Sequence, residues 1–116
     1  MSQIIIAVVD DMFFASKIRA VAEAVGAEIS FPRSKEALMQ KVQETNSRLV
    51  IVDLHNQKID PNEVAKELTG IRLLGFFSHV QTDLQRNAIA AGFDEVIPRS
   101  VFARDLAKIL ATDLHR

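Results

Sequence analysis

The stretch that decides the fold is Gln3-Ile4-Ile5-Ile6-Ala7-Val8-Val9-Asp10-Asp11. It holds six consecutive apolar residues, five of them β-branched, and this pattern predicts a strand that is buried on both faces. The run is too short for a buried helix, and helical periodicity begins only after the acidic pair. Two carboxylates at the end of a buried strand are costly unless something uses them. In open α/β sheets, binding sites form at the carboxyl ends of the strands.

The composition indicates one globular domain, which we expect to span residues 1–116. Apolar residues make up 48% of the chain, which argues against disorder. The net charge of −1 gives no electrostatic footprint for nucleic acid or an anionic membrane. The chain has no cysteine, so disulfides, thiol chemistry and cysteine-ligated zinc are excluded.

No segment predicts export or membrane insertion. The longest apolar run is far shorter than a membrane span, and no basic region followed by an apolar stretch opens the chain. We therefore expect a cytoplasmic protein without an attached output domain.

Apolar periodicity divides the chain into five strands that alternate with five helices. Later strands are predicted at 27–31, 48–53, 71–77 and 96–97. The later helices are predicted to begin at the capping residues Ser34, Asp60, Thr82 and Ser100. Gly26, Gly70 and Gly92 follow predicted helices, and Pro98 predicts that the last strand lies at an edge.

Strict alternation of strands and helices requires a parallel sheet that is covered by helices on both faces. We predict a single doubly wound (βα)5 domain with strand order 2-1-3-4-5. In this order the first and third strands are neighbours at the point where the strand order reverses.

Polar side chains follow several of these strands. Asp10 and Asp11 follow the first strand, Asp53 ends the third, Ser78 follows the fourth and Arg99 follows the fifth. Three carboxylates at one edge repel each other unless a cation or a raised pKa relieves them. Mg²⁺ suits such a site, because it prefers a few carboxylates together with water and phosphate oxygens.

With these residues in this order, the chain resembles the response-regulator receiver domain of two-component signalling. The resemblance covers nearly the whole chain and rests on Val8–Asp11, Leu49–Leu54, Ser78 and Ala91–Arg99. It implies the flavodoxin-like receiver fold and a phosphoryl switch rather than an enzyme. At most, such a domain phosphorylates itself from a donor and removes the group again.

The resemblance also implies roles for individual residues. Asp53 would accept a phosphoryl group from a histidine kinase, a phosphotransfer protein or a small donor. Asp10, Asp11, Asp53 and the backbone carbonyl of His55 would hold Mg²⁺, and Ser78 would bond a phosphoryl oxygen. A downstream protein would bind the face of the fourth helix, fifth strand and fifth helix, which carries Gln81, Asp83, Arg86, Asn87 and Arg104. Homodimerisation is a further possibility.

The sequence departs from the family pattern at several positions. Arg99 stands in place of the family lysine, where it would either clamp Asp53 or bind phosphate. Ser100 replaces a proline that usually follows a cis bond, so we expect a trans bond here. His79 replaces a small residue and would narrow the entrance, and Val96 replaces an aromatic residue that reports the switch.

These departures leave a second interpretation open. The chain would then be a pseudo-receiver, a protein-interaction module that works without phosphorylation. Asp10 or Asp11 would only cap the first helix, and Arg99 would be a structural partner of one acid.

Met12, Phe13 and Phe14 are expected to form a hydrophobic staple and core, but an exposed Phe13 would be a contact candidate near the site. A flavodoxin-like cofactor carrier is disfavoured, because no glycine-rich phosphate loop follows the first strand.

Overall fold

The computed structural model describes residues 4–78 and 82–114. Its strands are β1 (Ile4–Val8), β2 (Glu28–Ser30), β3 (Leu49–Asp53), β4 (Arg72–Phe77) and β5 (Glu95–Pro98). Its helices are α1 (Met12–Val25), α2 (Lys35–Glu44), α3 (Pro61–Glu67), α4 (Thr82–Ala91) and α5 (Arg99–Leu114). All strand pairs are parallel, in the order β2-β1-β3-β4-β5, which confirms the predicted topology. The edge position of β5 is confirmed as well.

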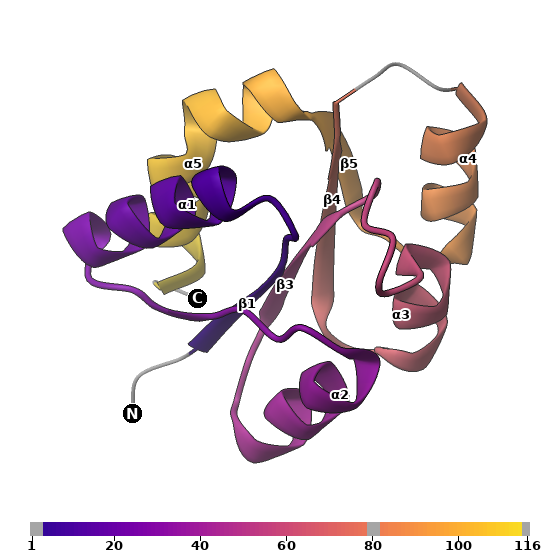
Figure 1. Ribbon diagram of the computed structural model, residues 1–116, viewed down its shortest axis with the longest axis horizontal. Coiled ribbons are helices and arrows are strands. Elements are labelled where there is room, and N and C mark those ends of the chain that lie inside the picture. Colours follow the sequence, from indigo (N-terminus) through magenta and orange to yellow (C-terminus); the bar gives the residue numbers. More distant parts are fainter. Residues whose placement is uncertain (1–3, 79–81, 115–116) are drawn as a thin grey trace.

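The helices cover the two faces of the sheet in two groups. Figure 1 shows α1 and α5 side by side on one face, and α2, α3 and α4 on the other. Strands β1 and β3 are neighbours, although the chain reaches β3 only after β2. The reversal of strand order therefore lies between β1 and β3, and their carboxyl ends meet there.

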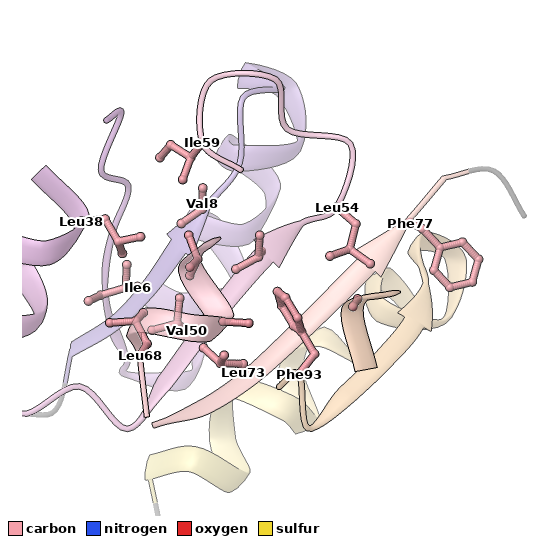
Figure 2. Close-up of a cluster of buried hydrophobic side chains, with 14 residues drawn as sticks. Ile6, Val8, Leu38, Val50, Leu54, Ile59, Leu68, Leu73, Phe77 and Phe93 are labelled. Carbon is pink, nitrogen blue, oxygen red and sulfur yellow. The ribbon is translucent and has the colours of Figure 1, made fainter. Parts of the chain in front are cut away.

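Two hydrophobic clusters fill the space between the sheet and its helices. One joins side chains of β1, β3 and β4 to helices α2, α3 and α4, and Figure 2 shows its members Ile6, Val50, Leu38, Leu68 and Leu73. The other joins the sheet to α1 and α5 and contains the rings of Phe14, Phe76 and Phe102. Because β1 and β3 contribute to both clusters, their sequences read as continuous apolar runs.

Side-chain caps begin several helices as predicted. The Asp11, Ser34 and Asp60 side chains accept hydrogen bonds from backbone N–H groups in the first turns of α1, α2 and α3. Such caps satisfy N–H groups that have no partner within the helix. Gly26 ends α1 with a φ of 79°, a left-handed conformation that glycine adopts without steric cost.

At three helix starts the structure differs from the expectation or does not describe the capping residue. Ser100 does not cap α5, because β5 passes directly into a helix that begins at Arg99. Thr82 is the first residue of α4, so the capping position precedes the part of the chain described there. The staple prediction is wrong for Met12 and Phe13, which are 65% and 92% exposed. The core face of α1 instead starts with Phe14 and continues at intervals of four residues.

Other features of the backbone agree with the sequence. The described residues contain no cis peptide bond, so the bond between Arg99 and Ser100 is trans as expected. Within residues 4–78 and 82–114, no helix is long and apolar enough to cross a membrane.

Gly75 lies in β4 at a position with little room for a side chain. A Cβ atom at Gly75 would lie 2.9 Å from Cδ2 and 3.1 Å from Cγ of Leu54. We expect Gly75→Ala to lower the free energy of unfolding by about 1–3 kcal/mol, as overpacking of a dense core does. Urea denaturation measures this loss. Leu54→Ala removes the clashing atoms, so the double variant should lose less than the sum of the two single variants, and additive losses would contradict the steric explanation.

Candidate functional site at the carboxyl edge of the sheet

Asp53 ends β3 at the reversal point and is largely buried, with 9% of its surface exposed. Its Oδ1 atom accepts a hydrogen bond of 2.9 Å from the His55 backbone N–H. The Asn56 backbone N–H donates to the Asp53 carbonyl oxygen at 3.0 Å. These two bonds hold the turn that follows β3 and fix the direction of the Asp53 carboxylate.

The electrostatic surroundings of Asp53 are unfavourable to its charge. Burial raises the pKa of the Asp53 carboxyl above its ordinary value. The hydrogen bond from the His55 backbone and the charges of His55 and Arg99 lower this pKa in part, whereas the negative charge of Asp10 raises it further. A buried carboxyl with a perturbed pKa at a sheet edge is a candidate functional group.

Asp11 uses both of its carboxylate oxygens. Its Oδ1 atom caps α1 by accepting hydrogen bonds from the backbone N–H groups of Phe13 at 3.0 Å and Phe14 at 3.2 Å. Its Oδ2 atom accepts a hydrogen bond of 3.0 Å from Nη2 of Arg99, which also forms an ion pair. The hydrogen bond from Arg99 is the main reason that the pKa of Asp11 is lowered.

Arg99 lies between Asp11 and an aromatic ring. The central carbon of its guanidinium group is 4.1 Å from the centroid of the Phe14 ring, in a cation–π arrangement. The expectation that Arg99 pairs with one of the acids is confirmed, but its hydrogen-bond partner is Asp11 and not Asp53. Helices α1 and α5 pack on the same face of the sheet, so the start of α5 places Arg99 beside the start of α1.

The remaining predicted residues lie at the same edge. Asp10 is exposed, His55 is half-buried and Ser78 is exposed at the end of β4. His79 lies outside the described residues.

Sequence reasoning missed two residues that shape the edge. Phe14 supports Arg99 from 85 positions away, and Asn56 holds the loop after β3 with bonds from the backbone N–H groups of Lys58 and Ile59. Only Asn56 carries a local signal, the preference of asparagine for such turns.

Comparison with known proteins gives a match in structure but not in sequence. No protein-family model and no curated protein matches the chain. A response regulator from Hahella chejuensis superposes with a TM-score of 0.83 and 19% identity, over 97% of this chain and 96% of that chain. A response regulator receiver domain protein (CheY-like) from Methanospirillum hungatei gives 0.82 and 18%, over 99% and 95%. The chain has the receiver-domain fold.

A third structure with the same fold carries a phosphorylated aspartate. It is a response regulator protein from Burkholderia pseudomallei with a phosphorylated aspartic acid, calcium ion and citrate. It superposes with a TM-score of 0.74 and 15% identity, over 96% of this chain and 72% of that chain. At such identities the likeness establishes the fold, and function has to be argued from the site.

The donor chemistry of this receiver-fold edge suits Mg²⁺ only in part. The carboxylate oxygens of Asp10 and Asp53 and the carbonyl oxygen of His55 are ligands of the kind that Mg²⁺ prefers. A dication on Asp11 would lie beside the guanidinium of Arg99 and would be repelled by it. In the part of the chain that the structure describes, no three acidic or histidine side chains are grouped closely enough to hold a metal ion. Magnesium binding therefore stays a prediction.

The ion pair between Arg99 and Asp11 makes a pH-dependent contribution to stability. Because the pKa of Asp11 is lowered in the folded chain, this contribution is present above the ordinary value of 3.8 and is lost as the pH falls through the folded value. Arg99→Gln should lower the urea midpoint at neutral pH, and the difference from the wild type should shrink in acid. A residual difference should remain, because the packing of Arg99 on Phe14 does not depend on this charge.

Arg86→Gln provides the matched control, since Arg86 is an exposed arginine on α4. Its urea midpoint should stay close to that of the wild type at every pH. A constant difference between Arg99→Gln and the wild type from neutral pH to strong acid would contradict the importance of the Asp11 charge.

Proposed function

We propose that this chain is a receiver-like signalling domain in which Asp53 accepts a phosphoryl group from a histidine kinase or a phosphotransfer protein. The observation that carries this proposal is the burial of Asp53 at the reversal point of the sheet. Among the described residues, it is the only buried ionisable side chain. Keeping a carboxyl group there costs stability, and such a cost is typical of residues that are retained for a function.

The proposed transfer is a single displacement at phosphorus. The second carboxylate oxygen of Asp53, which does not bind the His55 N–H, forms the new O–P bond. The N–P bond of the donor phosphohistidine breaks, and the electron pair returns to the imidazole, which then takes a proton. The hydroxyl of Ser78 donates to a phosphoryl oxygen. Mg²⁺, held by Asp10, Asp53 and the His55 carbonyl, would supply the positive charge that such a reaction needs.

The relative from Burkholderia pseudomallei supports this proposal, because it carries a phosphorylated aspartate and a calcium ion on the same fold. Arg99 is the main departure. Arg99 must either keep its ion pair with Asp11 or share its positive charge with the phosphoryl group. The paired N–H donors of its guanidinium suit phosphate oxygens as well as a carboxylate.

A downstream partner would bind the face formed by α4, β5 and α5. Asp83, Arg86 and Asn87 of α4 and Arg104 of α5 are exposed on these elements, and Gln81 lies outside the described residues. Ile89 adds an apolar contact on α4, with 59% of its surface exposed. Partner identity, homodimerisation and cytoplasmic location stay predictions.

Incubation with an acyl phosphate donor and Mg²⁺ tests the proposal. The intact mass should increase by one phosphoryl group, and hydroxylamine should remove the added mass because the product is an acyl phosphate. A receiver of known competence serves as the control for the donor. An unchanged mass beside a modified control would contradict phosphorylation from small donors.

A second candidate function is supported by the use of Asp11 in the structure. Because both of its oxygens are already bonded, Asp11 acts as a structural residue that joins α1 to α5. The chain would then be a pseudo-receiver that binds its partner without phosphorylation. In that case the mass would stay unchanged, and Asp11→Ala would lower the free energy of unfolding, because it removes the cap of α1 and the partner of Arg99.

A further inference from the structure

A cavity of about 320 Å³ lies beside the acidic edge. It is formed by the start of α1, the connection between β2 and α2, and the connection between β3 and α3. Its volume falls within the range of roughly 300–1,000 Å³ that is common for small-molecule sites. Asp10 belongs to its wall, whereas Asp53 and Arg99 do not.

The charge of the cavity wall differs from that of the chain. Arg19, Arg33 and Lys58 line it, against the single carboxylate of Asp10, while the whole chain has a net charge of −1. In the described residues, none of these three cations takes part in an ion pair. A concave site that is positive on a mildly acidic protein attracts anions.

The two arginines of the cavity rest against its apolar side chains. The guanidinium of Arg19 lies over the Phe31 ring, 5.0 Å from its centroid, and Nη2 of Arg33 is 4.0 Å from Sδ of Met12. Both contacts hold a planar cation beside an apolar surface. Met12 remains 65% exposed, so a ligand in the cavity can contact this apolar part of the wall.

The cationic side chains and the apolar side chains form the two halves of the wall, and together they define the chemistry of the ligand. A purely apolar ligand would leave three cations without an anionic partner, and a bare anion would leave the parts of Met12 and Phe31 that line the cavity without an apolar contact. Guanidinium groups bind phosphate oxygens through paired N–H donors. A phosphate dianion also neutralises more of the excess positive charge than a single carboxylate does.

We propose that this cavity binds a small organic phosphate, with the phosphate group among Arg19, Arg33 and Lys58 and a flat apolar body against Phe31 and Met12. The charge of Asp10 keeps the phosphate on the basic side of the cavity. The site shares Asp10 with the proposed metal site but does not depend on the proposed phosphoacceptor function, because its ligand binds without covalent change and without Asp53.

Phenyl phosphate is a suitable probe, since it joins a phosphate dianion to an aromatic ring. Titration into the ¹⁵N-labelled chain in magnesium-free buffer should shift the backbone amides of Ser16, Phe31 and Arg33 in a saturable manner, with a Kd of about 1 mM or tighter. Inorganic phosphate and phenol should each bind at least about tenfold more weakly, because each uses only half of the wall. Asp53→Asn should bind phenyl phosphate as the wild type does.

Arg33→Gln should weaken phenyl phosphate binding about tenfold, as the loss of a hydrogen bond to a charged group does. Arg33 is exposed on a connection, so the variant should keep its fold, which well-dispersed amide signals would verify. Arg86→Gln removes the same charge from α4 and should leave the Kd unchanged. Equal effects of the two variants, equal binding of inorganic phosphate, or absence of saturable shifts would each overturn the proposal.

Discussion

Asp53→Asn is expected to abolish the phosphoryl adduct completely. The amide of asparagine cannot act as the oxygen nucleophile, although it has almost the same size and its oxygen can still accept the hydrogen bond from the His55 backbone N–H. Intact mass after incubation with an acyl phosphate and Mg²⁺ measures this loss. Asp83→Asn, which changes an exposed carboxylate on α4, should be modified as the wild type is. Modification of Asp53→Asn to the same extent would exclude Asp53 as the acceptor.

The same variant should be more stable than the wild type at neutral pH. Because burial raises the pKa of Asp53, stability linked to its protonated form is present below the ordinary value of 3.8 and is lost as the pH rises through the folded value. Asparagine has no charge to bury, so it avoids this loss. Urea denaturation with a chelator present should show the advantage at neutral pH, and it should fade below about pH 4.

Phe102→Ala is expected to lower the free energy of unfolding by about 3–5 kcal/mol, because it removes a large buried ring. Phe102 is fully buried and stacks on Phe76, with ring centroids 4.8 Å apart and an angle of 4° between the planes. Phe14 packs on both rings from α1 and carries the guanidinium of Arg99 on its own ring. The loss is a large fraction of the stability of roughly 5–15 kcal/mol that is typical of a domain.

Phe13→Ala is the matched control for this measurement. It removes the same ring from a side chain that is 92% exposed, so the free energy of unfolding should change by less than about 0.5 kcal/mol. Denaturant unfolding of both variants, followed by circular dichroism, gives the comparison. Similar losses in Phe13→Ala and Phe102→Ala would contradict the described packing of α1 and α5 against the sheet.

The fold could be predicted because its signals are local. The apolar run at the start of the chain encodes a doubly buried strand, and Asp60 with Pro61 encodes a helix start without any distant contact. Strict alternation of these signals then leaves few possible topologies. The signals failed where three apolar residues are adjacent at the start of α1. Composition does not tell which of them faces the core, whereas the structure shows that Phe14 alone shares the face of Ile18 and Ala22, at intervals of four residues.

The candidate site was predictable as a group of residues but not as a set of contacts. Parallel strands end at one edge, so Asp10, Asp11 and Asp53 had to meet there once the strand order was known. The partner of Arg99 depends on side-chain directions across 88 positions of sequence, and no local pattern encodes these directions. The cavity beside Asp10 was missed for the same reason, since helix α1 and two separate connections bring its cations together.

Locating the phosphoryl group on the chain tests the central claim most directly. Borohydride reduces an acyl phosphate of aspartate to homoserine, and tandem mass spectrometry of the resulting peptides identifies the altered residue. After treatment with an acyl phosphate and Mg²⁺, we predict homoserine at position 53 and unchanged side chains at Asp10 and Asp11. Homoserine at either of those two positions, or an unaltered Asp53 in a folded chain beside a reactive control receiver, would contradict the assignment of Asp53 as the phosphoacceptor.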